Sequence, residues 1–152
     1  MTVPAAARHP DTDDAGPRHV LVADDEPHIG RIIQMKLEQG PFHVTLAHDG
    51  REALDALAQG PRVDLLVLDL MMPSVSGLDV LAQLRADPRH ATLPCIVLTA
   101  AGQEQQYRQA MALGATDFMT KPFSPKKLYA RAAELAGVAD AAEAEPGAGA
   151  AA

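Results

Sequence analysis

The chain has 152 residues and a formal net charge of −7, with 47% hydrophobic and 22% charged residues. This length fits one domain with its own hydrophobic core, and the acidic balance argues against a free-standing nucleic-acid-binding domain, which usually presents a basic face. The single cysteine, Cys95, excludes an intrachain disulfide and a cysteine-based zinc site. No apolar run reaches the roughly 18 residues of a membrane span, and no continuous apolar segment at the N-terminus indicates a secretory signal. We therefore expect a cytoplasmic protein without membrane contact.

The two ends of the chain differ in composition from the region between them. Residues 1–18 are rich in Ala, Pro and Asp, and residues 138–152 are rich in Ala. Neither end carries enough apolar surface to offset the entropy lost on ordering. We predict one domain over residues 19–137, between a disordered N-terminal tail and a disordered C-terminal tail.

Five short apolar segments predict β-strands. They lie at residues 19–23, 42–47, 63–69, 95–99 and 117–120. The third and fourth are almost continuously apolar, a pattern typical of strands that are covered on both faces.

Each predicted strand is followed by a segment with the apolar spacing of a helix. The first such segment carries the stripe Ile29, Ile32, Ile33 and Leu37. Similar stripes lie within residues 53–57, 78–84 and about 103–113, and the last segment begins with Ser124 and Pro125, a helix N-cap followed by a first-turn proline. This alternation predicts an α/β fold, a doubly wound parallel sheet of five strands with five flanking helices and right-handed crossovers.

Polar side chains stand where four of the predicted strands end. Asp24 and Asp25 follow the first strand, Asp69 ends the third, Thr99 ends the fourth, and Lys121 follows the fifth. Each of them alone would be an ordinary loop residue. Because the carboxyl ends of parallel strands meet at one edge of the sheet, where such folds bind ligands, the five together predict a functional site.

Three carboxylates in one crevice repel one another and therefore need a cation. Oxygen ligands without Cys or His favour a hard ion, so we predict Mg²⁺, with Mn²⁺ possible, rather than zinc. One carboxylate can then act as a nucleophile toward phosphorus, and Asp69, at the end of the central strand, is the candidate. Lys121 would spread the charge of the transferring phosphoryl group, and Thr99 would donate a hydrogen bond to it.

Four segments resemble the receiver domain of bacterial response regulators. They are VLVADDEP (20–27), VLDLMMPSVSGLDVL (67–81), IVLTA (96–100) and GATDFMTKPFSPKKL (114–128), in the order and spacing of that family. The resemblance covers about residues 19–137. It implies a flavodoxin-like fold with strand order 2-1-3-4-5, a cis peptide bond between Lys121 and Pro122, and a positive φ at Gly77.

The resemblance also implies a function. The chain would be a phosphoacceptor response regulator of a two-component system, a signalling switch and not an enzyme. A sensor histidine kinase or a histidine phosphotransfer protein would donate a phosphoryl group to Asp69 in a Mg²⁺-dependent reaction. Asp24, Asp25, Asp69 and the backbone carbonyl of Met71 would bind the ion.

Two further residues are implied to respond to phosphorylation, Thr99 as the switch hydroxyl and Phe118 as the switch aromatic. Their movement would remodel the face formed by the fourth helix, the fifth strand and the fifth helix. That face would then bind a downstream protein or a second copy of the chain. Met71 and Ala101 stand where the family tunes the loss of phosphate. Both are apolar here, so we predict slow autodephosphorylation.

A dimer through this face is only partly supported. Asp117 and Arg131 match a cross-dimer ion pair of a DNA-binding subfamily, whereas Lys127 replaces a usual Glu, and Tyr107 lies in a segment that lacks the subfamily's basic pattern. We expect no direct contact between this chain and nucleic acid.

Several alternatives stay open. A Mg²⁺-dependent aspartyl-phosphate phosphohydrolase of the haloacid dehalogenase type also uses an Asp nucleophile, but on its first strand as DxD, where this chain has the adjacent pair Asp24 and Asp25. The chain could also be the receiver fragment of a multidomain transcription regulator, or a receiver that has lost phosphotransfer. A flavin or dinucleotide protein is disfavoured, because no glycine-rich loop follows the first strand.

Overall fold

The computed structural model describes residues 16–138, and the rest of both predicted tails lies outside the described residues. The first strand begins at Arg18. At the other end, the amide of Val138 donates a 2.8 Å hydrogen bond to the carbonyl of Ala133. Arg18 and Val138, each one residue outside the predicted limits, thus take part in the fold, and the domain limits of 19 and 137 stay a prediction.

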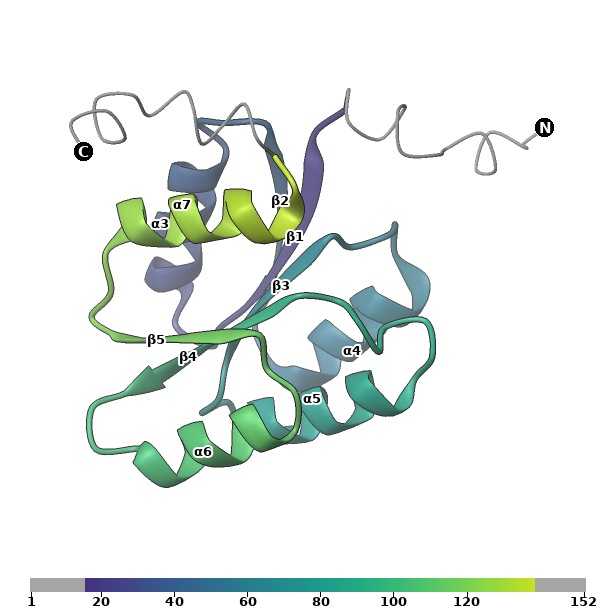
Figure 1. Ribbon diagram of the computed structural model, residues 1–152, viewed down its shortest axis with the longest axis vertical. Coiled ribbons are helices and arrows are strands. Elements are labelled where there is room, and N and C mark those ends of the chain that lie inside the picture. Colours follow the sequence, from purple (N-terminus) through teal and green to yellow (C-terminus); the bar gives the residue numbers. More distant parts are fainter. Residues whose placement is uncertain (1–15, 139–152) are drawn as a thin grey trace.

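Within residues 16–138, five strands and five helices alternate along the chain (Figure 1). The strands are β1 (Arg18–Ala23), β2 (Phe42–Ala47), β3 (Leu65–Asp69), β4 (Cys95–Ala100) and β5 (Asp117–Lys121). The helices are α3 (Pro27–Leu37), α4 (Gly50–Gln59), α5 (Gly77–Ala86), α6 (Glu104–Ala112) and α7 (Pro125–Ala136). The strands form one parallel sheet in the order β2-β1-β3-β4-β5, which confirms the predicted fold class and strand order.

The sheet separates two hydrophobic cores, with α3 and α7 on one face and α4, α5 and α6 on the other (Figure 1). Every residue of β3 is buried. Leu66 and Leu68 pack in the core beside α4 and α5, whereas Leu65 and Val67 pack in the core beside α3 and α7. Successive side chains of a strand point to opposite faces, so a continuously apolar strand serves both cores.

The stripe predicted for α3 is wrong at one position. Ile33 and Leu37 are fully buried, and Ile29 packs against the same core, but Ile32 is 43% exposed. At 100° per residue, Ile29, Ile33 and Leu37 share one face of the helix while Ile32 lies on its flank. Ile32 therefore belongs to the surface of α3.

The expected positive φ at Gly77 is also wrong. The described glycines with positive φ are Gly102, Gly114 and Gly137, whereas Gly77 is the first residue of α5. A Cβ at Gly77 would lie 2.4 Å from the carbonyl oxygen of Asp69 and 2.5 Å from the Cα of Leu70. The absence of a side chain, and not unusual backbone freedom, lets α5 begin directly against the end of β3.

Candidate functional site

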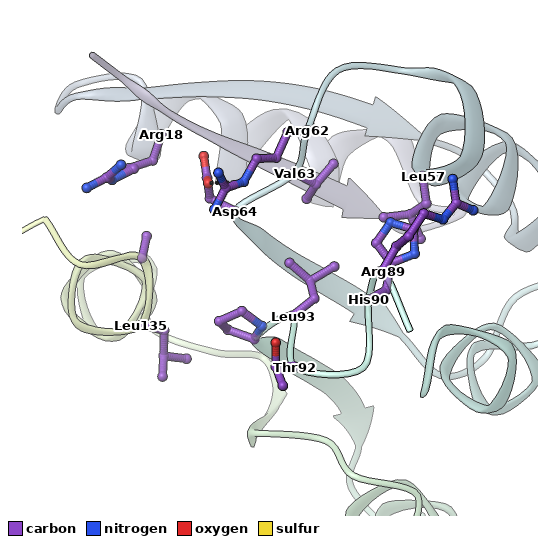
Figure 2. A pocket seen from close by; sticks show the side chains of 12 residues that line it. Arg18, Leu57, Arg62, Val63, Asp64, Arg89, His90, Thr92, Leu93 and Leu135 are labelled. Carbon is purple, nitrogen blue, oxygen red and sulfur yellow. Dashed lines mark ion pairs between the residues drawn. The ribbon is translucent and has the colours of Figure 1, made fainter. Parts of the chain in front are cut away.

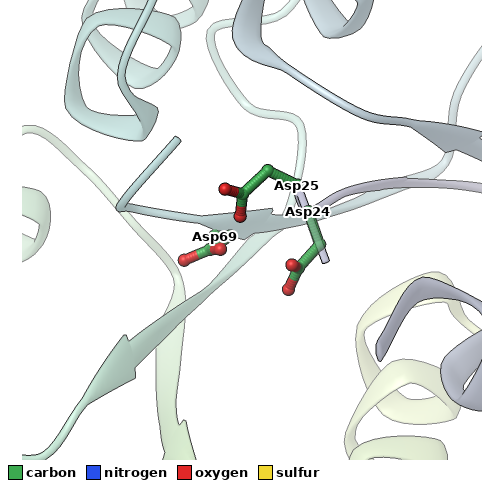
Figure 3. A group of neighbouring side chains, drawn as sticks. All are labelled: Asp24, Asp25 and Asp69. Carbon is green, nitrogen blue, oxygen red and sulfur yellow. The ribbon is translucent and has the colours of Figure 1, made fainter. Parts of the chain in front are cut away.

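Three aspartates from two neighbouring strands meet at the carboxyl edge of the sheet (Figure 3). Asp24 and Asp25 follow β1, and Asp69 is the last residue of β3. One carboxylate oxygen of each lies within 4.8 Å of those of the other two. Asp24 and Asp69 are buried, whereas Asp25 is exposed, so this acidic group opens to solvent on one side.

The carboxylate of Asp24 is anchored on one oxygen only. Its Oδ1 accepts a 2.8 Å hydrogen bond from the amide of Glu26. Its Oδ2 is buried and makes no hydrogen bond, although the Nζ of Lys121 lies 2.9 Å away as an ion pair. The charge of Lys121 compensates this buried oxygen, and the oxygen has no hydrogen-bond donor that a metal ion would have to displace.

Lys121 connects the aspartates electrostatically. Its Nζ donates a 3.2 Å hydrogen bond to Oδ2 of Asp69, and it lies 3.9 Å from a carboxylate oxygen of Glu26. Burial alone would lower the pKa of Lys121, but its interactions with the carboxylates of Asp24 and Asp69 outweigh burial and leave the pKa above its ordinary value. The side chain therefore stays an ammonium. The Lys121–Pro122 peptide bond is cis, as the family resemblance predicts.

Asp69 is in an environment that disfavours its charge. Its Oδ1 accepts a 3.1 Å hydrogen bond from the amide of Met71, and its Oδ2 accepts the bond from Lys121. Burial, followed by the nearby charge of Asp24, nevertheless raises the pKa of Asp69 from 3.8 to about 6. The lysine therefore only partly offsets the crowding of carboxylates, and a divalent cation would relieve it further.

These observations fit a hard divalent ion. Asp24, Asp25 and Asp69 offer carboxylate oxygens only, the ligand type of Mg²⁺, and one of these oxygens is buried and lacks a hydrogen bond. Met71, the further predicted ligand, has a half-exposed side chain next to the group. That the backbone carbonyl of Met71 binds the ion stays a prediction.

The two predicted switch residues lie beside one cavity. Thr99 is 4% exposed at the end of β4, and Phe118 is half-buried in β5. Both line a cavity of about 450 Å³ together with Tyr107 of α6, whose ring centroid is 4.1 Å from that of Phe118. The structure thus brings Thr99, Phe118 and Tyr107 together next to α6.

The predicted interface residues have partners or roles within the chain. Arg131 Nε and Asp117 Oδ2 form a close ion pair of 2.6 Å between α7 and β5 of the same molecule. This contact and a hydrogen bond to Glu134 raise the pKa of Arg131. Lys127 is exposed, and its amide donates to the Ser124 side chain that caps α7.

Glu26 also belongs to this site, although the sequence motifs do not predict it. Its side chain is half exposed, its amide orients Asp24, and its carboxylate lies near Lys121. The signal was its position, directly after the two aspartates at the end of β1.

Comparisons with known proteins agree with this geometry. The model of the response regulator receiver domain family matches residues 20–133. The uncharacterized transcriptional regulatory protein YkoG of Bacillus subtilis is 41% identical over 113 residues, 74% of this chain and 48% of that protein. The DNA-binding dual master transcriptional regulator RpaA of Synechocystis is 40% identical over 116 residues, 76% of this chain and 48% of that protein. The chain therefore spans about half the length of the curated relatives it matches.

Solved structures resemble the fold as well. The receiver domain of the Francisella response regulator 1452 is 34% identical, with a TM-score of 0.72 over 79% of this chain and 97% of that one. Among the described residues, no helix is long and apolar enough to cross a membrane.

Proposed function

Because the chain belongs to the family of response regulator receiver domains, we propose that it is the phosphoacceptor of a two-component system and that Asp69 receives the phosphoryl group. Members of this family are signalling switches that interact with histidine kinases. The observation that carries the proposal is the position of Asp69, which is 4% exposed at the end of the central strand, beside Lys121 and two further aspartates.

The transfer uses the side chains of this edge. A carboxylate oxygen of Asp69 attacks the phosphorus of a phosphohistidine, so an O–P bond forms and the N–P bond breaks. The electron pair of the broken bond stays on the imidazole nitrogen, which takes a proton from solvent. Lys121, already 3.2 Å from Asp69 Oδ2, stabilises the negative charge on the phosphoryl oxygens. The hydroxyl of Thr99 donates a hydrogen bond to a phosphoryl oxygen of the product.

The proposal includes a Mg²⁺ requirement. Asp24, Asp25 and Asp69 would hold the ion, with the carbonyl of Met71 as a further ligand, and Mn²⁺ could replace it. When bound, the ion supplies positive charge that offsets both the crowded carboxylates and the phosphoryl oxygens.

The surface around this edge has exposed apolar side chains on which a protein that donates the phosphoryl group could dock. α3 begins three residues after Asp24, and it exposes the large apolar side chain of Ile32 at 43% near its middle. Met71, which follows Asp69 in the chain, is 50% exposed. Apolar side chains of this kind are typical of protein–protein contacts. The donor would be a sensor histidine kinase or a histidine phosphotransfer protein.

The output is proposed to pass through the face of α6, β5 and α7. Its occupant would be a downstream protein or a second copy of the chain. A dimer that uses Asp117 and Arg131 would have to exchange their ion pair, because the two residues already pair within one molecule.

The expectation of no nucleic-acid contact is not supported for a longer protein. RpaA is named a DNA-binding regulator and YkoG a transcriptional one, and the matched segment covers 48% of each of them. We propose that this receiver is part of a longer transcriptional regulator, as the matched segment is in these two relatives.

Acetyl phosphate provides the direct test. With Mg²⁺, the intact mass of the wild-type chain should increase by one phosphoryl group, and the Asp69→Asn variant should show no increase. Asp87→Asn, on the opposite edge of the sheet, is the matched control and should be modified like the wild type. A folded wild-type chain that stays unmodified would overturn the proposal, and steady hydrolysis of a generic phosphomonoester would favour the phosphohydrolase instead.

The lifetime of the acyl phosphate is expected to be long. Neither Met71 nor Ala101, both exposed beside the site, can orient an attacking water by hydrogen bonding through its side chain. Decay of the modified mass after removal of acetyl phosphate measures this lifetime, and a half-life of a few seconds would contradict the expectation.

A further inference from the structure

A cavity of about 710 Å³ lies at the amino edge of the sheet, opposite the edge that carries the three aspartates (Figure 2). Its walls come from the start of β1, from the residues just before β3 and β4, and from the last turn of α7. The charged side chains on these walls are three arginines and one aspartate, namely Arg18, Arg62, Arg89 and Asp64. Cations therefore outnumber acids in a cavity to which the proposed function gives no role.

Two of these arginines have carboxylate partners within the fold, but both pairs are open to solvent. The Nε of Arg62 lies 3.5 Å from Asp64, and the side chain of Arg62 is 72% exposed. The Nη2 of Arg89 lies 2.8 Å from Asp87, and the side chain of Arg89 is 63% exposed. Exposed ion pairs are weak, and a guanidinium carries five N–H donors, so a further carboxylate can join or exchange with either pair.

The chain that follows α7 leaves the fold at the wall of this cavity. Leu135 and Ala136 line the cavity, and the amide of Val138, the last residue that the structure describes, is bonded to the carbonyl of Ala133. The next seven residues, 139–145, contain no base and three acids, which are Asp140, Glu143 and Glu145. Seven residues reach at most about 24 Å when extended. Three carboxylates thus follow within a short reach of the arginines.

The other acidic end of the chain joins the fold on a different side of β1. Asp11, Asp13 and Asp14 precede this strand. The amide of Arg18 donates a 3.0 Å hydrogen bond to the carbonyl of Pro41, just before β2. β1 lies between β2 and β3, and the cavity walls before β3 and β4 are on the other side of β1 from that bond. We therefore assign the cavity to the segment after α7.

We propose that the acidic segment 139–145 docks in the amino-edge cavity and that its carboxylates bind the guanidinium groups of Arg18, Arg62 and Arg89. Attachment at Val138 makes the contact intramolecular, and so short a link keeps the effective concentration of the acids in the millimolar range. Individually weak ion pairs are then enough to favour the docked segment. This docking goes beyond the proposed function and needs neither metal nor phosphorylation. It directs the chain along the amino edge, away from Asp69.

A spin label in the segment tests the docking. Cys95, the native thiol, is buried, and burial raises its pKa to about 12, so a label reacts selectively with the thiol of an Ala142→Cys variant. At low salt, the label should broaden the amide signals of Val63 and Leu93 in the cavity walls. Salt at about 1 M, where the Debye length is about 3 Å, should reduce this broadening.

Neutral acids separate docking from mere attachment. The triple variant Asp140→Asn, Glu143→Gln, Glu145→Gln in the labelled chain should reduce the broadening at low salt by about threefold or more, because only the covalent link then keeps the label near. The matched control neutralises the other end with Asp11→Asn, Asp13→Asn and Asp14→Asn, and it should leave the broadening unchanged.

The arginines can be tested from the cavity side. Arg62→Gln combined with Arg89→Gln should reduce the broadening as the neutral segment does. Arg108→Gln, which changes an exposed arginine of α6, is the control and should have no effect. If the double variant fails to fold, the neutral segment still decides the matter, because it leaves every residue of the domain unaltered.

Three outcomes overturn the proposal. The first is equal broadening with the acidic and the neutral segment at low salt. The second is loss of broadening in the N-terminal control, which would assign the cavity to the other end of the chain. The third is broadening that appears only between molecules, when spin-labelled chains are mixed with isotope-labelled chains, because the segment would then dock on a second copy.

Discussion

The two edges of the sheet both carry charged side chains, but they arrange them in opposite ways. At the carboxyl edge, the carboxylates of Asp24, Asp25 and Asp69 lie close together (Figure 3), and the ammonium of Lys121 pairs with Asp24 and Asp69. The amino edge has a cavity of about 710 Å³, lined by Arg18, Arg62 and Arg89 together with polar and apolar side chains (Figure 2). There, Arg62 lies 3.5 Å from Asp64, and Arg89 lies 2.8 Å from Asp87. Charges at the amino edge are thus matched by opposite charges, whereas those at the carboxyl edge are mostly of one sign.

The pKa values of one aspartate from each edge reflect this difference in charge compensation. Burial and the charge of Asp24 raise the pKa of Asp69 to about 6. Hydrogen bonds from Arg89 lower the pKa of the partly buried Asp87 to about 2. The comparison teaches that crowded, buried like charges identify the reactive edge better than the size of a cavity does.

The arginines of the amino edge have a structural explanation. In this fold all five helices run antiparallel to the strands, so their C-terminal ends lie at the amino edge of the sheet. The unpaired carbonyls there carry partial negative charge, which favours cations. Arg62 and Arg89 each follow the end of a helix, α4 and α5 respectively.

Removal of the cation that pairs with Asp24 and Asp69 should have the largest effect. We expect Lys121→Gln to lower the rate of phosphorylation by acetyl phosphate by about a hundredfold, because a donor to the developing negative charge is lost. The rate is measured by intact mass over time. Arg89→Gln is the counterpart at the amino edge and should leave the rate unchanged. Equal rates for Lys121→Gln and the wild type would contradict the role given to Lys121.

The second largest expected effect is a Mg²⁺-dependent gain in stability that depends on the aspartates of the carboxyl edge and not on those of the amino edge. At a Mg²⁺ concentration a hundred times its Kd, the wild type should gain about 2.7 kcal/mol of unfolding free energy. The gain should disappear with a chelator and in the Asp24→Asn, Asp25→Asn double variant, but persist in Asp87→Asn. Urea unfolding with and without Mg²⁺ measures it. A full gain in the double variant would place the ion elsewhere.

The pH dependence of stability should show the third effect. The folded-state pKa of Asp69 is raised from 3.8 to about 6 without metal. A carboxyl with a raised pKa favours the folded state below its unfolded pKa, and this contribution is lost as the pH rises through about 6. Between about pH 4.5 and about pH 7, Asp69→Asn should therefore gain about 2 kcal/mol relative to the metal-free wild type.

Asp87 gives the opposite sign in a different pH window. Its lowered pKa adds stability above about 3.8, and that stability is lost as the pH falls through about 2. The difference between Asp87→Asn and the wild type should thus stay flat between about pH 4.5 and about pH 7. Urea unfolding of the wild type and both variants at about pH 4.5 and about pH 7 checks these two predictions. If the stability difference between Asp69→Asn and the wild type did not change with pH, crowding of the carboxylates would not raise the pKa of Asp69.

The smallest expected effect concerns the apolar surroundings of the carboxyl edge. Ile32→Asp should lower phosphotransfer from a phosphohistidine protein by about tenfold, since it places a charge in the proposed docking surface. Its reaction with acetyl phosphate, which needs no docking, should be unchanged. Equal losses with both donors would instead indicate damage to the site itself.

Strand and helix alternation could be predicted from the chain because each strand has its own apolar run and each helix its own stripe. Asp24, Asp69 and Lys121 could be predicted to meet, because parallel strands place their carboxyl ends at one edge. Ile32 and Gly77 could not be interpreted correctly. The exposure of Ile32 depends on which flank of α3 faces the sheet, and the need for Gly77 depends on how closely α5 approaches the end of β3.

The sequence by itself determined the fold class, the strand order implied by its family motifs, and the residue types available at the reactive edge. Those features follow from local periodicity and from the order of residues along the chain. Only the tertiary structure decided which charges are compensated, because pairing depends on distances between residues far apart in sequence. It places Lys121 against Asp24 and Asp69, Arg131 against Asp117, and Arg85 against the end of α6.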